Sequence, residues 1–144
     1  MDFFGGLDFD TRCARISIIN EKKKLIYSNS VRYDYNLKKQ SSWIDSCEKL
    51  LISLPLDIKR NIFNLAISGN FETLTAINLR GDTLGEAITF SQLCYGNEKL
   101  IESITIGSDH LKSLYSPLAK ELKLINKYGE NILLRHQSDF ITGW

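Results

Sequence analysis

Apolar and polar residues alternate along three short runs at the start of the chain. The first run, residues 3–9, is aromatic and contains glycine, and the alternation repeats over 14–19 and 25–33. A polar turn over 20–24 separates the second run from the third. Alternation with a period of two predicts strands, and short turns between consecutive strands predict an antiparallel meander.

A helix and a further strand are predicted after the meander. Either Ser41 or Ser42 can cap the helix, and Pro55 ends it. Apolar residues recur between them at helical spacing: Trp43, Cys47, Leu50, Leu51 and Leu54. The compact β-prone run 62–68 then predicts a strand buried in a mixed or parallel sheet.

The rest of the chain is predicted to hold short strands and helices. Strands are expected over 74–79 and 132–134, with a possible one over 87–90, and helices are expected over 117–126 and 139–144, capped by Ser116 and Ser138. This order predicts an α/β fold with an antiparallel start, in a single domain over 1–144. It is compatible with a mixed-sheet ribonuclease H-like fold, while the pattern alone leaves other α/β folds open.

Composition excludes several classes of function. The chain has 144 residues, of which 43% are apolar, and this suits one globular domain. Its net charge of +1 gives no strong positive field that would attract nucleic acid. No window is apolar enough to span a membrane, and the first residues do not form a signal peptide. The three cysteines, Cys13, Cys47 and Cys94, are far apart, which predicts free thiols in a reducing, cytoplasmic compartment.

The first candidate site is the segment Gly6-Leu7-Asp8-Phe9-Asp10-Thr11, followed by Arg15. An acid at a strand end can hold Mg²⁺ directly or through water, so Asp8 is a candidate metal ligand. Backbone N–H groups of the turn and the Thr11 hydroxyl can face phosphate oxygens, and Arg15 can add positive charge. Taken alone, such a segment is more often an ordinary turn than a nucleotide site, because Asp favours turns.

Two further segments have the form of strands that end in turns. The run 65–73, Leu-Ala-Ile-Ser-Gly-Asn-Phe-Glu-Thr, closes a predicted strand on Gly69. The run 77–84 has a glycine turn at Gly81 and leads to an apolar stretch that ends at Gln92. Taken alone, both segments are compatible with plain strand-and-turn structure.

These segments, in this order and with this spacing, resemble the N-terminal part of the FGGY carbohydrate kinases, close to xylulokinases and ribulose kinases. The Ser-Pro-Leu-Ala-Lys segment 116–120 and the His-Gln-Ser-Asp-Phe segment 136–140 also resemble the family. The resemblance implies a ribonuclease H-like lobe with phosphate and magnesium at Asp8, Thr11 and Arg15. It also implies sugar contacts at four residues: Asn70, Phe71, Glu72 and Gln92.

The sequence departs from the family pattern at three of these positions. Asp10 stands where the family has glycine, Arg12 where serine is common, and Gln92 where an acidic sugar ligand is expected. Glycine lets a backbone approach phosphate closely, whereas a carboxylate adds negative charge beside it. The resemblance implies Mg-ATP for a complete kinase, while Asp10 disfavours ATP binding by this chain alone.

Three hypotheses about function follow. In the first, the chain is the N-terminal part of an ATP-dependent kinase for a ketopentose, other sugar or polyol, inactive alone because the family's catalytic aspartate and adenosine-binding lobe lie downstream. In the second, it is a non-catalytic remnant that binds a sugar or a partner. In the third, it is a small α/β interaction domain without a ligand. Expected partners are a sugar, the missing kinase portion or a second copy of the chain.

Overall fold

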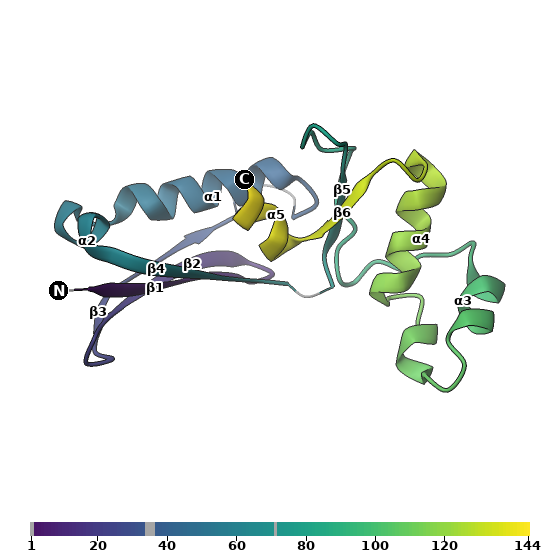
Figure 1. Cartoon of the computed structure of the whole chain (residues 1–144), viewed down its shortest axis with the longest axis horizontal. Coiled ribbons are helices and arrows are strands. Elements are labelled where there is room, and N and C mark those ends of the chain that lie inside the picture. The colour runs from purple at the N-terminus through teal and green to yellow at the C-terminus, as the bar shows by residue number, and fades with distance from the viewer. Residues whose placement is uncertain (1, 34–36, 71) are drawn as a thin grey trace. The chain divides into compact units, whose positions relative to one another are not determined.

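The computed structural model describes residues 2–33, 37–70 and 72–144 (Figure 1). These residues form two compact units, one made of residues 1–70 with 141–144 and the other of residues 71–140. The expectation of a single domain stays a prediction.

A four-stranded mixed sheet forms the first unit. Its strands are β1 (Phe3–Phe9), β2 (Cys13–Asn20), β3 (Leu25–Arg32) and β4 (Ile62–Gly69), in the order β3-β2-β1-β4. The β1–β2 and β2–β3 pairs are antiparallel, whereas β4 runs parallel to β1. The predicted antiparallel meander and mixed sheet are therefore confirmed.

The turn between β2 and β3 lies where the sequence predicts it. The Asn20 side-chain oxygen accepts the backbone N–H groups of Lys22 and Lys24, each at 3.0 Å. Lys23 adopts a left-handed conformation with φ 59°. The lysine run therefore has a local structural role in the turn.

Helix α1 (Gln40–Ser53) covers one face of the sheet and packs against β2 and β3 (Figure 1). The predicted serine caps are wrong, because Lys39 is the N-cap residue, without a side-chain cap, and both serines lie inside the helix. Trp43 is fully buried, and its indole Nε1–H donates to the Leu37 carbonyl at 3.0 Å. Pro55 ends α1 as predicted, and it also precedes the short helix α2 (Leu56–Asn61), which the sequence pattern missed.

Strand β4 is not buried as predicted, because among the described strands it lies at the edge of the sheet. Its Phe63 side chain is 67% exposed and that of Leu65 is 36% exposed. The physical reason is the position of α1, which lies over β2 and β3 and leaves β4 largely open. An apolar, β-prone run is therefore exposed at this edge.

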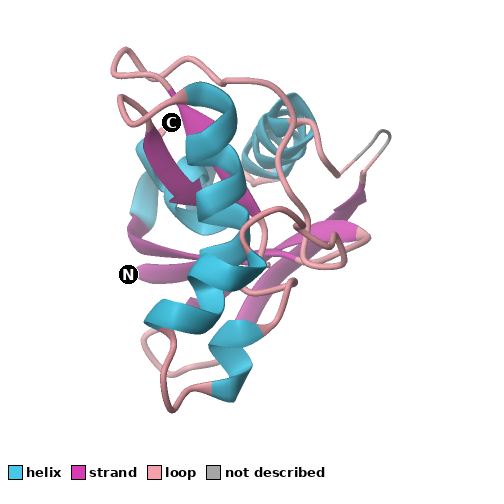
Figure 2. Ribbon diagram, turned by 90° about the vertical axis from the view of Figure 1, so that its right-hand side faces the viewer, coloured by secondary structure: helices cyan, strands magenta, loops and turns pink. Residues whose placement is uncertain are grey.

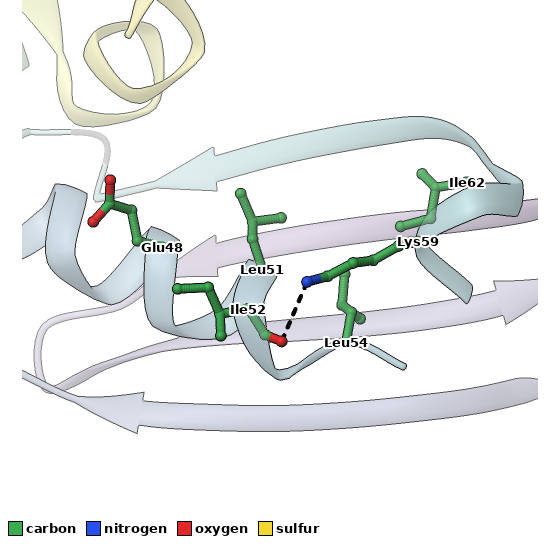
Figure 3. A pocket seen from close by; sticks show the side chains of 6 residues that line it. All are labelled: Glu48, Leu51, Ile52, Leu54, Lys59 and Ile62. Atoms are coloured by element: carbon green, nitrogen blue, oxygen red, sulfur yellow. Dashed lines mark hydrogen bonds between the residues drawn. The ribbon is translucent and has the colours of Figure 1, made fainter. Parts of the chain in front are cut away.

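An open groove of about 640 Å³ lies between α1, α2 and β4 (Figure 3). Its lining is mostly aliphatic: Leu51, Ile52, Leu54 and Ile62, with Glu48 and Lys59. The Lys59 Nζ donates to the Ile52 carbonyl at 3.3 Å, which satisfies one of the free carbonyl groups at the end of α1. The groove and the edge strand β4 therefore expose apolar side chains on the first unit.

The second unit has a small antiparallel sheet and four helical segments. The strands are β5 (Leu74–Ile77) and β6 (Leu133–His136), and the helices are α3 (Glu98–Ile104), the 3₁₀ helix η1 (Asp109–Lys112), α4 (Pro117–Tyr128) and α5 (Gln137–Gly143), whose last residues belong to the first unit. A long segment without named elements joins β5 to α3, and short loops join α3 to η1 and η1 to α4; loops are pink in Figure 2. The core contains the following buried residues: Leu74, Ala76, Ile88, Cys94, Ile101, Ala119 and Leu124.

The sequence predictions for this unit have mixed outcomes. Ser116 caps α4 as expected, with its hydroxyl oxygen accepting the Ala119 N–H at 3.2 Å, and Gly129 ends the helix with φ 84°. Residues 87–90 do not form a strand, since only an isolated bridge between Leu74 and Ile88 pairs there. Ser138 lies inside α5 and does not cap it. Trp144 follows this helix with 55% of its surface exposed.

Candidate functional site

The β1–β2 hairpin carries the three residues that the resemblance assigns to phosphate and magnesium, Asp8, Thr11 and Arg15. Only Asp10, Thr11 and Arg12 connect the two strands, and the Asp10 N–H donates across the turn to the Cys13 carbonyl at 3.0 Å. Asp8 lies in the last residues of β1 and Thr11 in the turn, as predicted.

Asp8 also lies beside the end of β4. In the parallel β1–β4 pair, Asp8 is opposite Ser68, and Phe9 is opposite Gly69. The carboxyl ends of the two strands therefore meet at one edge, where ligands of open α/β sheets bind. In the fold that the resemblance implies, the first strand and the strand that ends at Gly69 are neighbours, so Asp8 and Gly69 are expected to come close together, and this expectation is confirmed.

Asp8 and Arg15 lie on the face of the sheet opposite to α1. Side chains alternate along a strand, and the neighbours of Asp8, Leu7 and Phe9, are buried beneath the helix. Arg15 is directly opposite Asp8 in the β1–β2 register, and its Nη1 lies 4.0 Å from the Asp8 Oδ2. Both side chains are about half exposed, so this long ion pair contributes little to stability.

Asp10 makes the strongest contacts in the turn. Its Oδ1 accepts the Thr11 backbone N–H at 2.6 Å and the Thr11 hydroxyl at 3.3 Å. Its Oδ2 accepts from Arg15 Nη2 at 2.7 Å. The Thr11 backbone hydrogen bond first, and then the positive charge of Arg15, lower the pKa of Asp10 below its ordinary value. The carboxylate therefore stays ionised at neutral pH.

A polar pocket of about 340 Å³ opens beside this turn. It is lined by Asp10, Arg12, Cys13, Arg15 and Arg32. Three arginine residues thus line the same pocket as Asp10. The sequence analysis missed Arg32, although the strand register could have found it, since Arg32 lies directly opposite Cys13 on β3.

The residues predicted to bind sugar lie in different parts of the chain. Asn70 follows β4 in the first unit, whereas Glu72 and Gln92 belong to the second unit. Phe71 lies outside the described residues. The Glu72 carbonyl accepts a hydrogen bond from Lys120 Nζ at 2.7 Å, and the Gln92 N–H donates to the Thr89 carbonyl at 3.1 Å.

Lys120 is the last residue of the 116–120 segment, and the sequence analysis did not predict its burial. It lies on α4 between the buried residues Ala119 and Leu124, and its own side chain is fully buried. Burial lowers the pKa of Lys120, because the charged ammonium loses its hydration. In the sequence, only its position four residues before Leu124 on an amphipathic helix indicates that Lys120 is buried.

Solved structures of sugar kinases match the chain over nearly its whole length. A glycerol kinase from Plasmodium falciparum, solved with ADP, covers 98% of the chain with a TM-score of 0.71 and 14% identity. A gluconate kinase from Lactobacillus acidophilus covers 97% with a TM-score of 0.72 and 17% identity. A xylulose kinase from Rhodospirillum rubrum covers 97% with a TM-score of 0.70 and 15% identity. The chain has the fold of part of a sugar kinase.

The match confirms the expected resemblance to the N-terminal part of FGGY kinases at the level of the fold. The chain spans about a third of the length of these sugar kinases, between 32% and 33% of each. Neither protein-family models nor curated proteins match the sequence. Among the described helices, none has the length and apolar character needed to cross a membrane.

Mg-ATP, which the sugar kinase fold implies, does not fit the turn as it is arranged here. The Thr11 N–H, the Thr11 hydroxyl and the Arg15 guanidinium are the donors that a phosphate would need, and all three already bind the Asp10 carboxylate. The described residues also contain no group of three or more His, Cys, Asp or Glu side chains that could share a metal ion. Asp8 would therefore contribute at most one protein ligand, with water and phosphate completing the shell of a Mg²⁺ ion.

Proposed function

We propose that the chain forms the N-terminal, sugar-binding part of an ATP-dependent carbohydrate kinase, which transfers the ATP γ-phosphoryl group to a sugar hydroxyl. The observation that carries this proposal is the sugar kinase fold, with Asp8 at the carboxyl end of β1 beside the end of β4. In the complete kinase, Asp8 would hold Mg²⁺ through water, and Thr11 and Arg15 would bind phosphate once Asp10 is displaced from them. The residues proposed to contact the sugar are Asn70, Phe71, Glu72 and Gln92. A ketopentose such as xylulose or ribulose is the preferred substrate class, and the cytoplasm is the proposed location.

The same proposal holds that the chain has no kinase activity alone. Phosphoryl transfer depends on positioning and on charge stabilisation around the whole phosphate chain. The chain spans a third of the length of the matched kinases, and the donors of its own turn are bound to Asp10. The catalytic base and the adenosine site are assigned to a further portion of the kinase.

The test is to follow ADP release by the purified chain with Mg-ATP and a panel of pentoses, hexoses and polyols. We expect no turnover from the chain alone, and turnover after the segment encoded immediately downstream is added. Asp8→Ala should abolish the restored activity, whereas Asp57→Ala, a change at an exposed residue of α2, should leave it intact. Steady turnover by the chain alone that Asp8→Ala abolishes would refute the claim of inactivity.

A non-catalytic remnant that binds a sugar or a partner is the second candidate. Two residues favour it: Asp10, which binds the donors of the phosphate turn, and Gln92, which replaces an expected acid. A neutral amide binds a sugar hydroxyl less strongly than a carboxylate does. Sugar binding without restored turnover would support this second function.

A further inference from the structure

We infer that the Asp10 carboxylate is an internal substitute for a phosphate group, and that it closes the β1–β2 turn to anions in the unmodified protein. This inference rests on the proposed function, which assigns Thr11 and Arg15 to a phosphate. It adds that the Asp10 carboxylate binds these donors and that removal of this carboxylate frees them.

The contacts of Asp10 are of the kinds that hold phosphate oxygens. One carboxylate oxygen binds a backbone N–H and a hydroxyl, and the other binds a guanidinium group at 2.7 Å. Backbone N–H groups of turns and arginine side chains bind phosphate in the same way. Asp10 is attached to the turn that it fills, so no loss of translational freedom opposes its binding. A free phosphate must displace it.

The surrounding pocket keeps an excess of positive charge that Asp10 does not neutralise. Arg12 and Arg32 line the pocket together with Arg15. Within the described residues, Asp10 forms its ion pair with Arg15, and neither Arg12 nor Arg32 forms one. Removal of the Asp10 carboxylate therefore leaves a pocket of about 340 Å³ lined by three arginine residues beside the freed Thr11 donors, with the Asp8 carboxylate still 4.0 Å from Arg15. This set of groups suits a polyphosphate.

The experiment measures binding of inorganic tripolyphosphate, without Mg²⁺, nucleotide or sugar, by isothermal titration calorimetry. Asp10→Gly removes the carboxylate, and glycine retains the backbone N–H that Asp10 donates to Cys13. Asp10→Asn removes only the charge and serves as a second variant if the glycine variant does not fold, which circular dichroism will show. Asp57→Asn is the matched control, because it changes the net charge equally at an exposed residue outside the pocket.

We expect Asp10→Gly to bind tripolyphosphate at least tenfold more tightly than the unmodified chain, with Asp10→Asn between them and Asp57→Asn unchanged. Adding Arg15→Gln to Asp10→Gly should cancel the gain. Equal affinities for the unmodified chain and the folded Asp10 variants, or no binding by any of them, would overturn the inference. The test involves neither sugar nor turnover, so a failure of the kinase proposal in the ADP-release assay is a separate result.

Discussion

Lys120 shows at the scale of one residue what burial does to a charged group. Its side chain is fully buried, and its Nζ donates to the Glu72 carbonyl at 2.7 Å. One hydrogen bond to a neutral carbonyl replaces little of the hydration that an ammonium group loses. The lowered pKa of Lys120 follows from this loss.

We predict that this lysine makes stability depend on pH. Since the folded protein binds the Lys120 proton less tightly than the unfolded chain does, the free energy of unfolding rises as pH increases from the lowered pKa toward 10.5, the ordinary pKa of lysine. The stability of the unmodified chain relative to Lys120→Met should therefore rise with pH, by at most about 1.4 kcal/mol per pH unit. Urea unfolding of both proteins between pH 7 and 10.5 measures this difference.

The comparison with Lys120→Met is needed because buried thiols titrate in the same range. Burial raises the pKa of Cys47 and Cys94 above 9.0, so their contribution to stability is lost as pH rises from 9.0 through the raised values. The effect of Cys47 cancels in the difference, whereas Cys94 interacts electrostatically with Lys120, so both proteins should also carry Cys94→Ala in this comparison. A difference that stays constant over the whole range would contradict the prediction for Lys120.

Gly85 permits a second prediction at the residue scale. Its φ of 82° is in the left-handed region, and a Cβ at this position would overlap the Tyr128 hydroxyl. Gly81 has a similar φ of 92° but open space around it. We expect Gly81→Ala to lower the free energy of unfolding by about 1 to 2 kcal/mol through backbone strain alone. Gly85→Ala should cost at least about 1 kcal/mol more through overpacking.

Urea unfolding followed by far-ultraviolet circular dichroism will measure both glycine variants. Equal losses of stability would show that the Tyr128 side chain moves aside at no cost, and the packing argument would then be wrong.

For the candidate site residues, their places in strands and turns were easier to predict from the sequence than their hydrogen bonds. Asp8 and Thr11 were placed correctly, because a strand that ends in a polar turn is a local pattern. The hydrogen bonds of Asp10 with Thr11 and Arg15 depend on the geometry of a three-residue turn, which residue types do not determine. The burial of Lys120 was not predicted, because its ammonium group contacts residue 72, which is far away in the sequence.

At the scale of elements, strand β4 illustrates a limit of apolar patterns. The pattern predicted its existence and its place in a mixed or parallel sheet, both confirmed, but its burial depends on where α1 packs. The short helices α2 and α3, of six and seven residues, were missed because they contain too few turns to show a helical period. Helix α4 was predicted well because Ser116, Pro117 and Gly129 mark both of its ends locally.

The exposed β4 edge predicts self-association of the isolated chain. Unpaired strand edges with exposed apolar side chains pair with other chains, and lysine at an edge opposes this pairing. Phe63→Lys should therefore shift the chain toward monomer in sedimentation velocity at concentrations where the unmodified chain associates. The side chain of Phe63 is 67% exposed, so the substitution leaves the core of the first unit intact.

A matched control separates the edge strand from apolar exposure in general. Ile106 in the second unit is 88% exposed, and Ile106→Lys should leave association unchanged. An unmodified chain that is monomeric throughout, or an equal effect of both substitutions, would count against the edge as the associating surface.

At the scale of the whole molecule, the sequence contains no linker that would mark the division into two compact units. The boundary near residues 70 and 71 follows the end of β4 directly, and α5 carries the chain back to the first unit after residue 140. Composition detects a boundary only when glycine, proline or polar residues accumulate there. The mixed sheet itself could be predicted, because strand order follows from short turns and one helical connection.

The positions of the two tryptophans have an optical consequence. Trp43 and Trp144 both belong to the first unit, one fully buried and the other 55% exposed, and they are the only tryptophans in the sequence. Emission excited selectively at the indole bands therefore comes from the first unit alone. The second unit, whose aromatic residues are tyrosine and phenylalanine, is silent in that signal. Tryptophan fluorescence therefore reports on the unit that contains the Asp10 turn.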